Sequence, residues 1–509
     1  MKIKNLSSLI KDGIAQNWHS SSVCYGHFDV IHPGHQRYFQ TARKHGNPLI
    51  IAVEGDVTLQ KIGARIAYSQ TERAQGVASI DVVDQVVVLD TGNLEVLVDL
   101  VEPSALVLGR EFERERLYEV KEAVAKLEQI GGKLIYDVGE THSAATDLFS
   151  KNIDELEKLR WQQFQTTLAS RSVDLKKVVS EISSSRSCKI LVIGDTIVDR
   201  FVACDPVGMS NEAPVVVVKE IDQRDFIGGA GIVAAHVAAL GADSIYLSVV
   251  GGDVRADFVR RKLNEFSVQD YLYKDSSRPT TNKIRYMVEN QKLFRVSQLK
   301  EHAVPTDVEN KLCNKICELA PTLDAIVVCD FVYGVVTGRI IDQVNRASKQ
   351  YGMPVLGDLQ CSSQIGDISK FKGFSLLSPT EREARIAMGN NNDSVEYVAN
   401  ALLKRTRASH MILKMGAEGV IAYSKSGESD YFDRQHFPAL SVNPVDVAGA
   451  GDSMLAGVSV AMARGCSLME ATAIGTLMGA ISVNSVGNVP ISYQSLVNYT
   501  HQILSYPET

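Results

Sequence analysis

Short, uninterrupted apolar runs recur along this chain, and segments with helical spacing separate them. The runs cover residues 22–25, 49–53, 86–89, 105–109, 188–193, 325–329 and 354–357. Runs of this length, bounded by Gly or Asp, are typical of strands that are buried on both faces of a parallel sheet. Their alternation with helical segments predicts an α/β protein.

Residues 152–182 depart from this alternation. They carry apolar residues at helical spacing among Glu, Lys and Gln, and a Ser-rich stretch follows at 183–187. We therefore expect an N-terminal domain at residues 1–150, a helical linker at 151–186 and a second domain at 187–509. The second linker helix is expected to dock on the C-terminal domain.

Composition narrows the possible partners and the compartment. The 509 residues are 45% hydrophobic and 22% charged, with a formal net charge of -7 and no basic block, so nucleic acid is not an expected partner. The eight Cys are scattered without a Cys-x-x-Cys pair, which fits free thiols in a reducing cytoplasm. No signal peptide is expected at the N-terminus, and the apolar segment 454–483 is interrupted by Arg464 and Glu470. We expect packed core helices there, no membrane partner and a cytoplasmic protein.

The stretch Asp-Val-Ala-Gly-Ala-Gly-Asp at residues 446–452 is the strongest chemical signal. Small residues lie between two carboxylates, and an apolar run begins at Ser453. This pattern predicts a loop entering a helix N-terminus, where free N–H groups bind anions such as phosphate. Asp452 would then be a base that accepts a proton from an attacking hydroxyl. Local chemistry alone equally allows Asp452 to be a helix cap.

That stretch resembles the signature of the ribokinase-like (PfkB) sugar kinases. The resemblance implies that Asp452 is the catalytic base, that the amides of Gly449, Ala450 and Gly451 form the anion hole, and that Asp446 contributes to substrate binding. It implies ATP as the phosphoryl donor and Mg²⁺ as the metal ion.

Other segments match the same family in the same order. Asp195 and Asp199 follow the apolar run at 188–193, and the family pattern implies that they bind sugar hydroxyls, together with the turn Gly228-Gly229. Residues 213–218 and a further short strand correspond to a small β lid. In relatives this lid covers the sugar and often makes a dimer contact, so a homodimer through the lid is expected.

The nucleotide side of the predicted kinase lies further along the chain. Glu383 matches a residue that holds Mg²⁺ through water, although a Glu in the first turn of a helix is an alternative. Lys414, Gly416 and Gly419 match the strand and turn beside ATP.

A second nucleotide motif follows the first apolar run. The string Gly-His-Phe-Asp-Val-Ile-His-Pro-Gly-His at 26–35 places two His three apart at a helix start, where both can donate to phosphate. A structural pair or half of a metal site is the alternative. The complete string resembles the cytidylyltransferase-like nucleotidyltransferases. The resemblance implies that His32 and His35 stabilise a triphosphate during attack on its α-phosphorus, with Phe28 and Asp29 in the same loop.

The rest of this Rossmann-like domain carries weaker matches. Gly109 ends an apolar run where a base could bind, and Arg73 falls where relatives carry phosphate-binding cations. Lys61 and Arg65 fall in similar places and are equally explained as surface cations. Thr146 matches a Ser-Thr-rich helix start, but Ala replaces the hydroxyl residues at 144–145.

Together the two halves resemble the bifunctional heptose 7-phosphate kinase/heptose 1-phosphate adenylyltransferase family of ADP-heptose synthesis, with the domain order reversed. The substrate side departs from that family: Ile232 stands where relatives carry Asn, and Tyr333 and Gln360 stand where they carry Lys. We expect a sugar phosphate and nucleoside triphosphates as substrates and ADP-heptose as product. A kinase/cytidylyltransferase that uses CTP and another sugar or polyol phosphate is one alternative. An active kinase with a non-catalytic N-terminal binding or oligomerisation domain is another.

Overall fold

The computed structural model divides the chain into two compact units, Met1–Asn152 with Asn392–Val398, and Ile153–Asn391 with Ala399–Thr509. The structure describes residues 2–14, 16–28, 31, 33–61, 68–90, 93–109, 112, 118–137, 153–183, 188–210, 212–213, 215–288, 291–361, 365–390, 393–425, 432–485 and 487–506.

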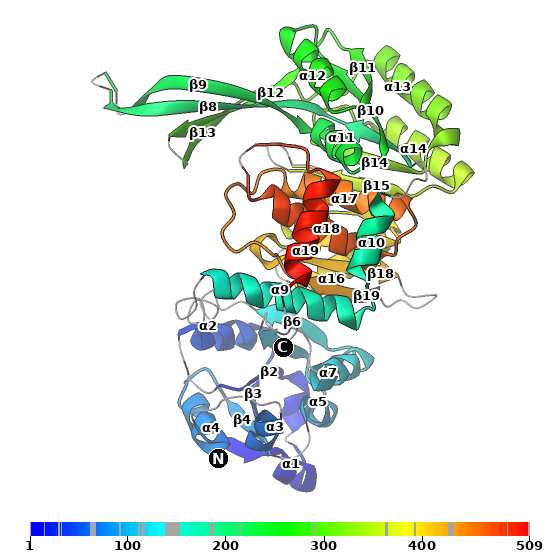
Figure 1. The fold of residues 1–509 in the computed structure, drawn as a ribbon. Helices are drawn as coiled ribbons and strands as arrows, with labels where there is room; N and C mark the ends of the chain where they lie inside the picture. The colour runs from blue at the N-terminus through cyan, green and yellow to red at the C-terminus, as the bar shows by residue number, and fades with distance from the viewer. Residues whose placement is uncertain are drawn as a thin grey trace. The chain divides into compact units, whose positions relative to one another are not determined.

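The first unit contains a parallel six-stranded sheet in the order β1-β4-β3-β2-β5-β6 (Figure 1). Its strands are β1 (Ile3–Asn5), β2 (Ser22–Gly26), β3 (Leu49–Glu54), β4 (Gln85–Leu89), β5 (Ala105–Gly109) and β6 (Lys133–Asp137). Its helices include α1 (Leu6–Asp12), α2 (Pro33–Ala42), α3 (Asp56–Lys61), α4 (Gln70–Ala78), α5 (Leu94–Val101) and α7 (Tyr118–Gln129). Short 3₁₀ turns are η1 (Gln16–Ser20) and η2 (Arg43–His45).

Both faces of this sheet are covered, as the uninterrupted apolar runs require. Along β2, Val23 and Tyr25 join one buried cluster, with α1, α5 and α7, whereas Cys24 joins the other, with α2 and α4. The strand order reverses between β2 and β5, and ligands of open parallel sheets bind at the carboxyl ends of strands at such a switch point. The loop that follows β2 begins there.

The second unit is built on a nine-stranded sheet in the order β11-β10-β7-β14-β15-β16-β17-β18-β19. Pairing is parallel from β11 to β17 and antiparallel for the last two pairs. The strands are β7 (Lys189–Gly194), β10 (Asp243–Val250), β11 (Gln269–Lys274), β14 (Ala325–Asp330), β15 (Val355–Leu359), β16 (Leu376–Leu377), β17 (His410–Lys414), β18 (Val420–Lys425) and β19 (Phe432–Phe437).

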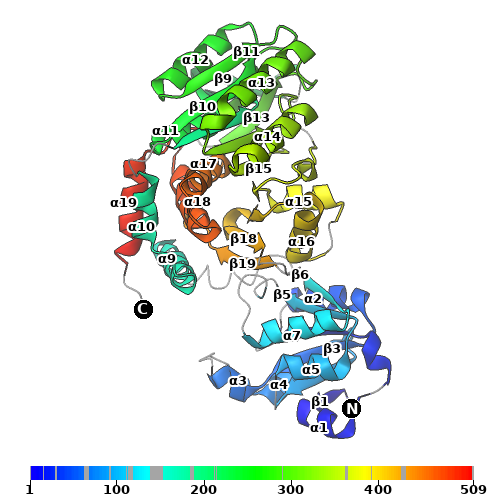
Figure 2. The same ribbon diagram turned by 90° about the vertical axis from the view of Figure 1, so that its right-hand side faces the viewer.

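Helices flank this sheet (Figure 2). They are α9 (Ile153–Ser170), α10 (Leu175–Ile182), α11 (Ala230–Ala239), α12 (Val254–Glu265), α13 (Thr306–Leu319), α14 (Gly338–Tyr351), α15 (Glu381–Met388), α16 (Val395–Thr406), α17 (Ala450–Ala463), α18 (Leu468–Ser482) and α19 (Tyr493–Leu504). The division between the two units passes through α16. Short 3₁₀ turns are η3 (Ala320–Thr322), η4 (Ile368–Lys370) and η5 (Gly416–Glu418).

A separate four-stranded sheet, β13-β12-β8-β9, forms an arm of the second unit (Figure 1). Its strands are β8 (Thr196–Met209), β9 (Val216–Gly229), β12 (Thr281–Val288) and β13 (Gln291–Gln298). The first residues of β8 and the last of β9 are buried, whereas their far ends and all of β13 are exposed. This arm occupies the place of the expected lid.

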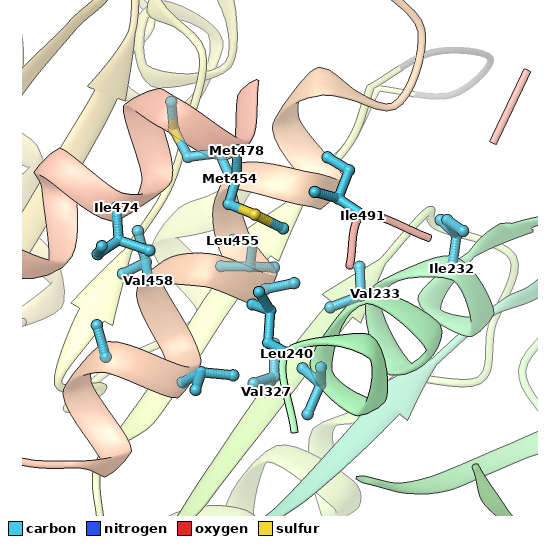
Figure 3. Packing of buried hydrophobic residues seen from close by; sticks show 14 of the residues in the cluster. Ile232, Val233, Leu240, Val327, Met454, Leu455, Val458, Ile474, Met478 and Ile491 are labelled. Atoms are coloured by element: carbon cyan, nitrogen blue, oxygen red, sulfur yellow. The ribbon is translucent and has the colours of Figure 1, made fainter. Parts of the chain in front are cut away.

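Three helices with few polar residues, α11, α17 and α18, form the centre of the second core (Figure 3). Small residues let α17 and α18 approach closely, because a Cβ atom on Gly457 would lie 2.7 Å from Met478 Cγ. The expectation that residues 454–483 form core helices is confirmed. Within the described parts of the chain, no helix combines the length and apolar character needed to cross a bilayer.

The two helices of the expected linker both belong to this second core. Trp161 and Phe164 of α9 and Val178 of α10 are members of the same buried cluster as α17 and α18. Gln165 Nε2 of α9 donates to the carbonyl of Ile503 in α19 at 2.9 Å. Only the second helix was expected to dock in this way, because the apolar spacing of a helix does not reveal what it packs against.

Candidate active sites

The loop after β2 is held by a hydrogen-bond network centred on Arg73. Arg73 was predicted to bind phosphate, yet its side chain is buried and its guanidinium donates to the carbonyls of His27, Glu54 and Tyr68 and to Asp56 Oδ1. This corrects the prediction: Arg73 ties the ends of β2 and β3 together and has its nitrogens committed to the protein. Asp29, His32, Arg65 and Thr146, and the side chain of Lys61, lie outside the described residues.

Phe28 and His35 are the described members of the predicted nucleotidyl-transfer loop. Phe28 has a φ of 52°, a left-handed conformation that is uncommon for an aromatic residue, and its ring meets that of His35 edge-on with centroids 5.3 Å apart. It also packs on Phe39 of α2, at 5.4 Å. The aromatic contact fixes His35 in the first turn of α2, where the helix dipole favours an anion. Gly109 ends β5, the neighbour of β2, and its role in binding a base stays a prediction.

In the second unit, the stretch 446–452 forms the predicted loop and helix start. Helix α17 begins at Ala450, and its N-cap is Gly449 in a left-handed conformation with φ 84°. A Cβ atom on Gly449 would lie 2.7 Å from Asn488 Oδ1, so glycine is required for both its conformation and its surroundings. The amides of the first turn, including that of Gly451, have no acceptor within the helix and point toward the space beyond its N-terminal end.

Asp452 is not the helix cap, because Gly449 occupies that position and Asp452 lies in the first turn. Its carboxylate is almost fully buried and accepts a hydrogen bond from Gln360 Nε2, which lies 2.7 Å from Oδ1. Burial, followed by repulsion from Asp358, raises the pKa of Asp452 to about 7, while Lys414 opposes the shift. A carboxyl group with this pKa is suited to exchange protons near neutrality.

A buried ion pair lies beside the same helix start. Lys414 Nζ contacts Asp358 Oδ1 at 2.7 Å, and a Cβ atom on Gly451 would lie 3.3 Å from that nitrogen. Burial disfavours the charge on Lys414, but Asp358 and Glu383 outweigh it and raise the pKa of the lysine. A permanent cation therefore lies against the first-turn amides, which strengthens the anion site.

Glu383 adopts the alternative that the sequence left open. It is the third residue of α15 and forms a reciprocal capping box with Thr380, whose amide donates to Oε2 at 2.8 Å. Its Oε1 accepts the amide of Cys361 at 3.0 Å. The capping role is confirmed, and the role in binding Mg²⁺ stays a prediction.

The donor set fits a magnesium ion that binds with its nucleotide. No group of three or more His, Cys, Asp or Glu side chains converges as a metal site in the described ranges. Mg²⁺ usually keeps several waters and takes one or two carboxylates plus substrate phosphates. Asp358 and Glu383, which both raise the pKa of Lys414, are the carboxylates suited to that arrangement.

Of the two predicted sugar-binding aspartates, only Asp199 lies among the polar groups at the base of the arm. Its Oδ1 accepts from Arg285 Nη1 at 2.5 Å and its Oδ2 from Asn488 Nδ2 at 2.8 Å. A Cβ atom on Gly228 would lie 2.2 Å from Oδ2, so the predicted Gly-Gly turn approaches this carboxylate closely.

Asp195 is buried and its carboxylate serves the backbone. Its oxygens accept the amides of Phe331, Tyr333 and Val335 at 2.8, 3.4 and 3.3 Å. Burial, followed by repulsion from Asp330, raises the pKa of Asp195 to about 7, against these three hydrogen bonds. This corrects the prediction that Asp195 binds sugar hydroxyls: it holds the loop after β14 in place.

The remaining predicted residues are turn formers around these groups. Gly229 caps α11 with φ 59°, and Gly416 (φ 62°) and Gly419 (φ 94°) form the turn after β17. A Cβ atom on Gly419 would lie 2.1 Å from the carbonyl oxygen of Phe437, whereas Gly416 has open space. Asp446 accepts from Lys292 Nζ of β13 at 2.8 Å and from the amide of Ala448 at 3.1 Å. The carboxylate of Asp446 therefore stabilises the loop in which it lies.

Comparison with known proteins decides the family. Residues 188–492, more than half of the chain, match the model of the pfkB family of carbohydrate kinases. The chain belongs to this family. Residues 23–186 match the cytidylyltransferase-like model. The two matches confirm the predicted fold class and join an enzyme domain of the pfkB kinase type to a cytidylyltransferase-like one.

Relatives with the printed name bifunctional protein HldE share part of the chain. Identity is 28% over 330 residues with the protein of Pelobacter propionicus (64% of this chain, 66% of that one). It is 29% over 321 residues with that of Helicobacter hepaticus (62% and 64%), and 30% over 323 residues with that of Campylobacter jejuni subsp. doylei (63% and 66%). The chain therefore spans just under two thirds of the length of these relatives.

Solved structures support the kinase fold. Phosphofructokinase-2 from Escherichia coli in complex with substrates and products matches 62% of this chain and 99% of its own, with a TM-score of 0.52 and 16% identity. The same enzyme in complex with fructose-6-phosphate gives 0.51 and 16%, over 62% and 98%. At this identity the likeness establishes the fold alone.

Two residues of the pfkB site were missed by sequence reasoning. Lys283 of β12 is 4% exposed, and its Nζ lies over the rings of Phe331 and Tyr333, 5.1 and 5.3 Å from their centroids. Burial raises the pKa of Asp452, the predicted base, and the charge of Lys283 is one of the contributions that oppose this shift. Nothing in the string around it signals burial, because a lysine within a polar strand usually lies in solvent.

Gln360 was noticed only as a missing lysine. Burial raises the pKa of Asp358, and a hydrogen bond from Gln360 is among the contacts that oppose this shift, so the one amide that binds Asp452 serves both carboxylates. The two substitutions on the substrate side are therefore connected to the site in different ways. Gln360 donates a hydrogen bond to the predicted base, and the Tyr333 ring makes a cation–π contact with the ammonium of Lys283.

Proposed function

We propose that the second unit transfers the γ-phosphoryl group of ATP to a hydroxyl of a sugar phosphate, and that the first unit joins a sugar 1-phosphate to a nucleotide. The observation that carries the proposal is the buried Asp452, whose pKa is raised to about 7 beside first-turn amides and the Lys414 cation. This combination offers a proton acceptor and an anion site at one helix end.

In the kinase step, the acceptor hydroxyl donates its proton to Asp452 as its oxygen attacks the γ-phosphorus. A new O–P bond forms, the bond to the bridging oxygen of ADP breaks, and ADP leaves with the electron pair. Gln360 occupies Oδ1 of Asp452, which leaves Oδ2 for the hydroxyl. The amides of Gly449, Ala450 and Gly451, with Lys414, stabilise charge on the phosphoryl oxygens. Bound Mg²⁺ supplies further charge neutralisation, and Glu383 and Asp358 are the groups that would hold it through water.

The acceptor is proposed to be anionic. Lys283 and Arg285 of β12 bring two cations to the base of the arm, close to Asp452 and Asp199 respectively. A phosphate on the sugar would complement this positive charge, which a neutral sugar does not. The Gly-Gly turn and Asp199 are proposed to bind the hydroxyls of the same molecule.

The identity of the sugar is argued from the relatives. Their shared arrangement supports a heptose phosphate and ADP-heptose as product, and hence a part in lipopolysaccharide biosynthesis. Ile232 is fully buried in the core between α11 and α17, so it offers no polar contact where relatives carry Asn (Figure 3). This observation supports a second candidate function, a kinase/nucleotidyltransferase for another sugar or polyol phosphate.

In the transferase step, an oxygen of the sugar 1-phosphate attacks the α-phosphorus of ATP or CTP and pyrophosphate leaves. His35, fixed by Phe28 at the start of α2, is proposed to stabilise the charge together with His32. An N-terminal unit that only binds or oligomerises remains the competing proposal. The proposed substrates are cytoplasmic metabolites, so the same proposal places the enzyme in the cytoplasm.

The deciding experiment is a product assay on the full chain with ATP, CTP, Mg²⁺ and a panel of sugar phosphates that includes heptose 7-phosphate, read by mass spectrometry. ADP-heptose supports the whole proposal. A sugar bisphosphate without nucleotide-sugar would support the competing view of the first unit. Turnover of a different sugar alone would overturn the heptose assignment.

The separation of the two sites is tested with one variant in each unit. Asp452→Asn should reduce kinase turnover by about 10²–10⁴-fold, as expected for loss of a general base, and leave nucleotidyl transfer unchanged. His35→Ala should do the reverse. An equal loss of both activities in either variant would contradict separate sites.

A further inference from the structure

A basic cavity of about 700 Å³, open to solvent and lined by exposed cations, lies in the second unit, where α14, the turn at Lys372 and the end of α16 meet. Its lining includes five cations, Arg346, Lys349, Lys372, Arg405 and Arg407, against one carboxylate, Asp342. Such a concentration is unusual in a chain with a net charge of -7. Like charges that share one cavity repel one another unless an anion lies between them.

Among the residues that the structure describes, four of these cations have no ion-pair partner. Arg405 lies 3.8 Å from Asp367 and donates to the carbonyl of Ala387. By contrast, no carboxylate within the described residues comes within 4.0 Å of the side-chain nitrogens of Arg346, Lys349, Lys372 or Arg407. Elsewhere in this unit, partly exposed cations such as Lys262 and Arg171 do pair with neighbouring carboxylates.

Arg407 adds an independent observation. It follows the last turn of α16 with φ 56°, and its amide donates to the carbonyl of Leu403 at 2.8 Å. Glycine is the usual residue in this left-handed position at a helix end, because a side chain is strained there. A cationic side chain therefore occupies a position whose backbone conformation disfavours any side chain.

The cavity is distinct from the kinase site. Lys349 lies near the end of α14, which leads into β15, Lys372 precedes β16, and Arg407 precedes β17. These positions are at the amino ends of three neighbouring parallel strands. Asp358 and Lys414 lie at the opposite, carboxyl ends of β15 and β17.

We propose that this cavity binds a ligand that carries two or more phosphate groups. Its volume exceeds what a single phosphate fills and is within the range of small-molecule sites. Cations from α14, from the turn before β16 and from the end of α16 face it together, which suits several phosphates rather than one. No aromatic or aliphatic side chain is among its lining residues, so the phosphates, not a base, are recognised.

The test is calorimetric titration of the full chain with inorganic pyrophosphate, tripolyphosphate and ATP. Arg407→Gly removes one cation and relieves the left-handed strain, so its melting temperature should not fall. Its affinity for tripolyphosphate should nevertheless drop by about threefold, and the double variant with Lys372→Gln by about tenfold. Arg407→Lys should retain most of the affinity. Lys176→Gln, the same loss of charge on the exposed face of α10, is the matched control and should bind as the parent does.

Two outcomes overturn the proposal. One is the absence of binding at millimolar tripolyphosphate. The other is binding that Arg407→Gly and Lys372→Gln leave unchanged and that ATP abolishes by competition at the kinase site. None of these readouts depends on catalysis, so a failure here is separable from a failure of the proposed function.

Discussion

At the scale of single residues, the protonation of Asp452 controls the proposed kinase step. Its pKa is raised to about 7, chiefly by burial, and the base works only as a carboxylate. Kinase kcat/KM should therefore rise with pH through about 7. Gln360 donates to the ionised form, so Gln360→Leu should move this rise upward by about one pH unit, the size expected for one lost hydrogen bond. A pH–rate profile of both proteins checks this, and an unchanged midpoint would contradict it.

The same protonation has a stability consequence of known sign. Because folding raises the pKa of Asp452 and Asp195 above the ordinary value of 3.8, the folded state binds these protons more tightly. Their stabilising effect is complete below about pH 4 and is lost as pH rises through about 7. Asp452→Asn, which is neutral at every pH, should have a smaller loss of melting temperature between pH 5 and pH 8 than the parent.

Lys283 is the residue through which the charge of the acceptor can be tested. Lys283→Met removes the ammonium from over Phe331 and Tyr333 and keeps an apolar side chain of similar length. We expect kcat/KM for a phosphorylated sugar to fall by at least about tenfold, mainly through KM, as for loss of a charge-assisted hydrogen bond. Lys283→Arg should restore part of it. An equal loss on the dephosphorylated sugar would assign Lys283 to the fold or to Asp452 instead.

At the scale of elements, the start of α17 depends on one glycine. Gly449→Ala would place a Cβ atom 2.7 Å from Asn488 Oδ1 in a left-handed backbone, and Asn488 in turn holds Asp199. Destabilisation of about 1–3 kcal/mol and loss of kinase activity are expected. Gly352→Ala is the matched control, because Gly352 is also left-handed, with φ 72°, but has open space. Denaturant unfolding of both variants measures the difference, and similar losses would show that strain alone matters.

The elements and the loop chemistry were largely predictable, whereas side-chain partners were not. Apolar runs located the strands, because burial on both faces of a sheet requires uninterrupted apolar residues. The 446–452 stretch located the start of α17, because its small residues mark a loop that enters a helix. Arg73 and Asp195 were misassigned because both are buried charges, Arg73 within α4 and Asp195 just after β7, whose partners are backbone groups of neighbouring loops. Whether such a group faces a ligand or neighbouring backbone depends on the loops folded around it. Lys283 and Gln360 were missed for the same reason, since their importance lies in contacts with residues far along the chain.

At the scale of the whole molecule, the arm is the element that predicts an assembly. Its exposed apolar side chains are on β8, β9 and β13: Val207, Met209, Val216, Val217, Ile221, Leu293, Phe294 and Val296. A two-sided sheet with this many exposed apolar residues usually pairs with another surface. We propose a second copy of the arm as the partner, which would form a homodimer through the lid.

This assembly can be separated from folding by choice of variant. Phe294 is 51% exposed and stacks only on Tyr286 within the described arm, at 4.7 Å. Phe294→Asp together with Val216→Asp should convert the dimer to a monomer in light scattering and leave the melting temperature of the nine-stranded core almost unchanged. Asp199 lies on β8 and Lys283 lies on β12, and both strands are part of the arm. The monomer should therefore also have a raised KM for the sugar phosphate. A parent chain that is monomeric at micromolar concentration would contradict the proposed contact, and a monomeric variant with unchanged KM would show that the arm positions these residues without a partner.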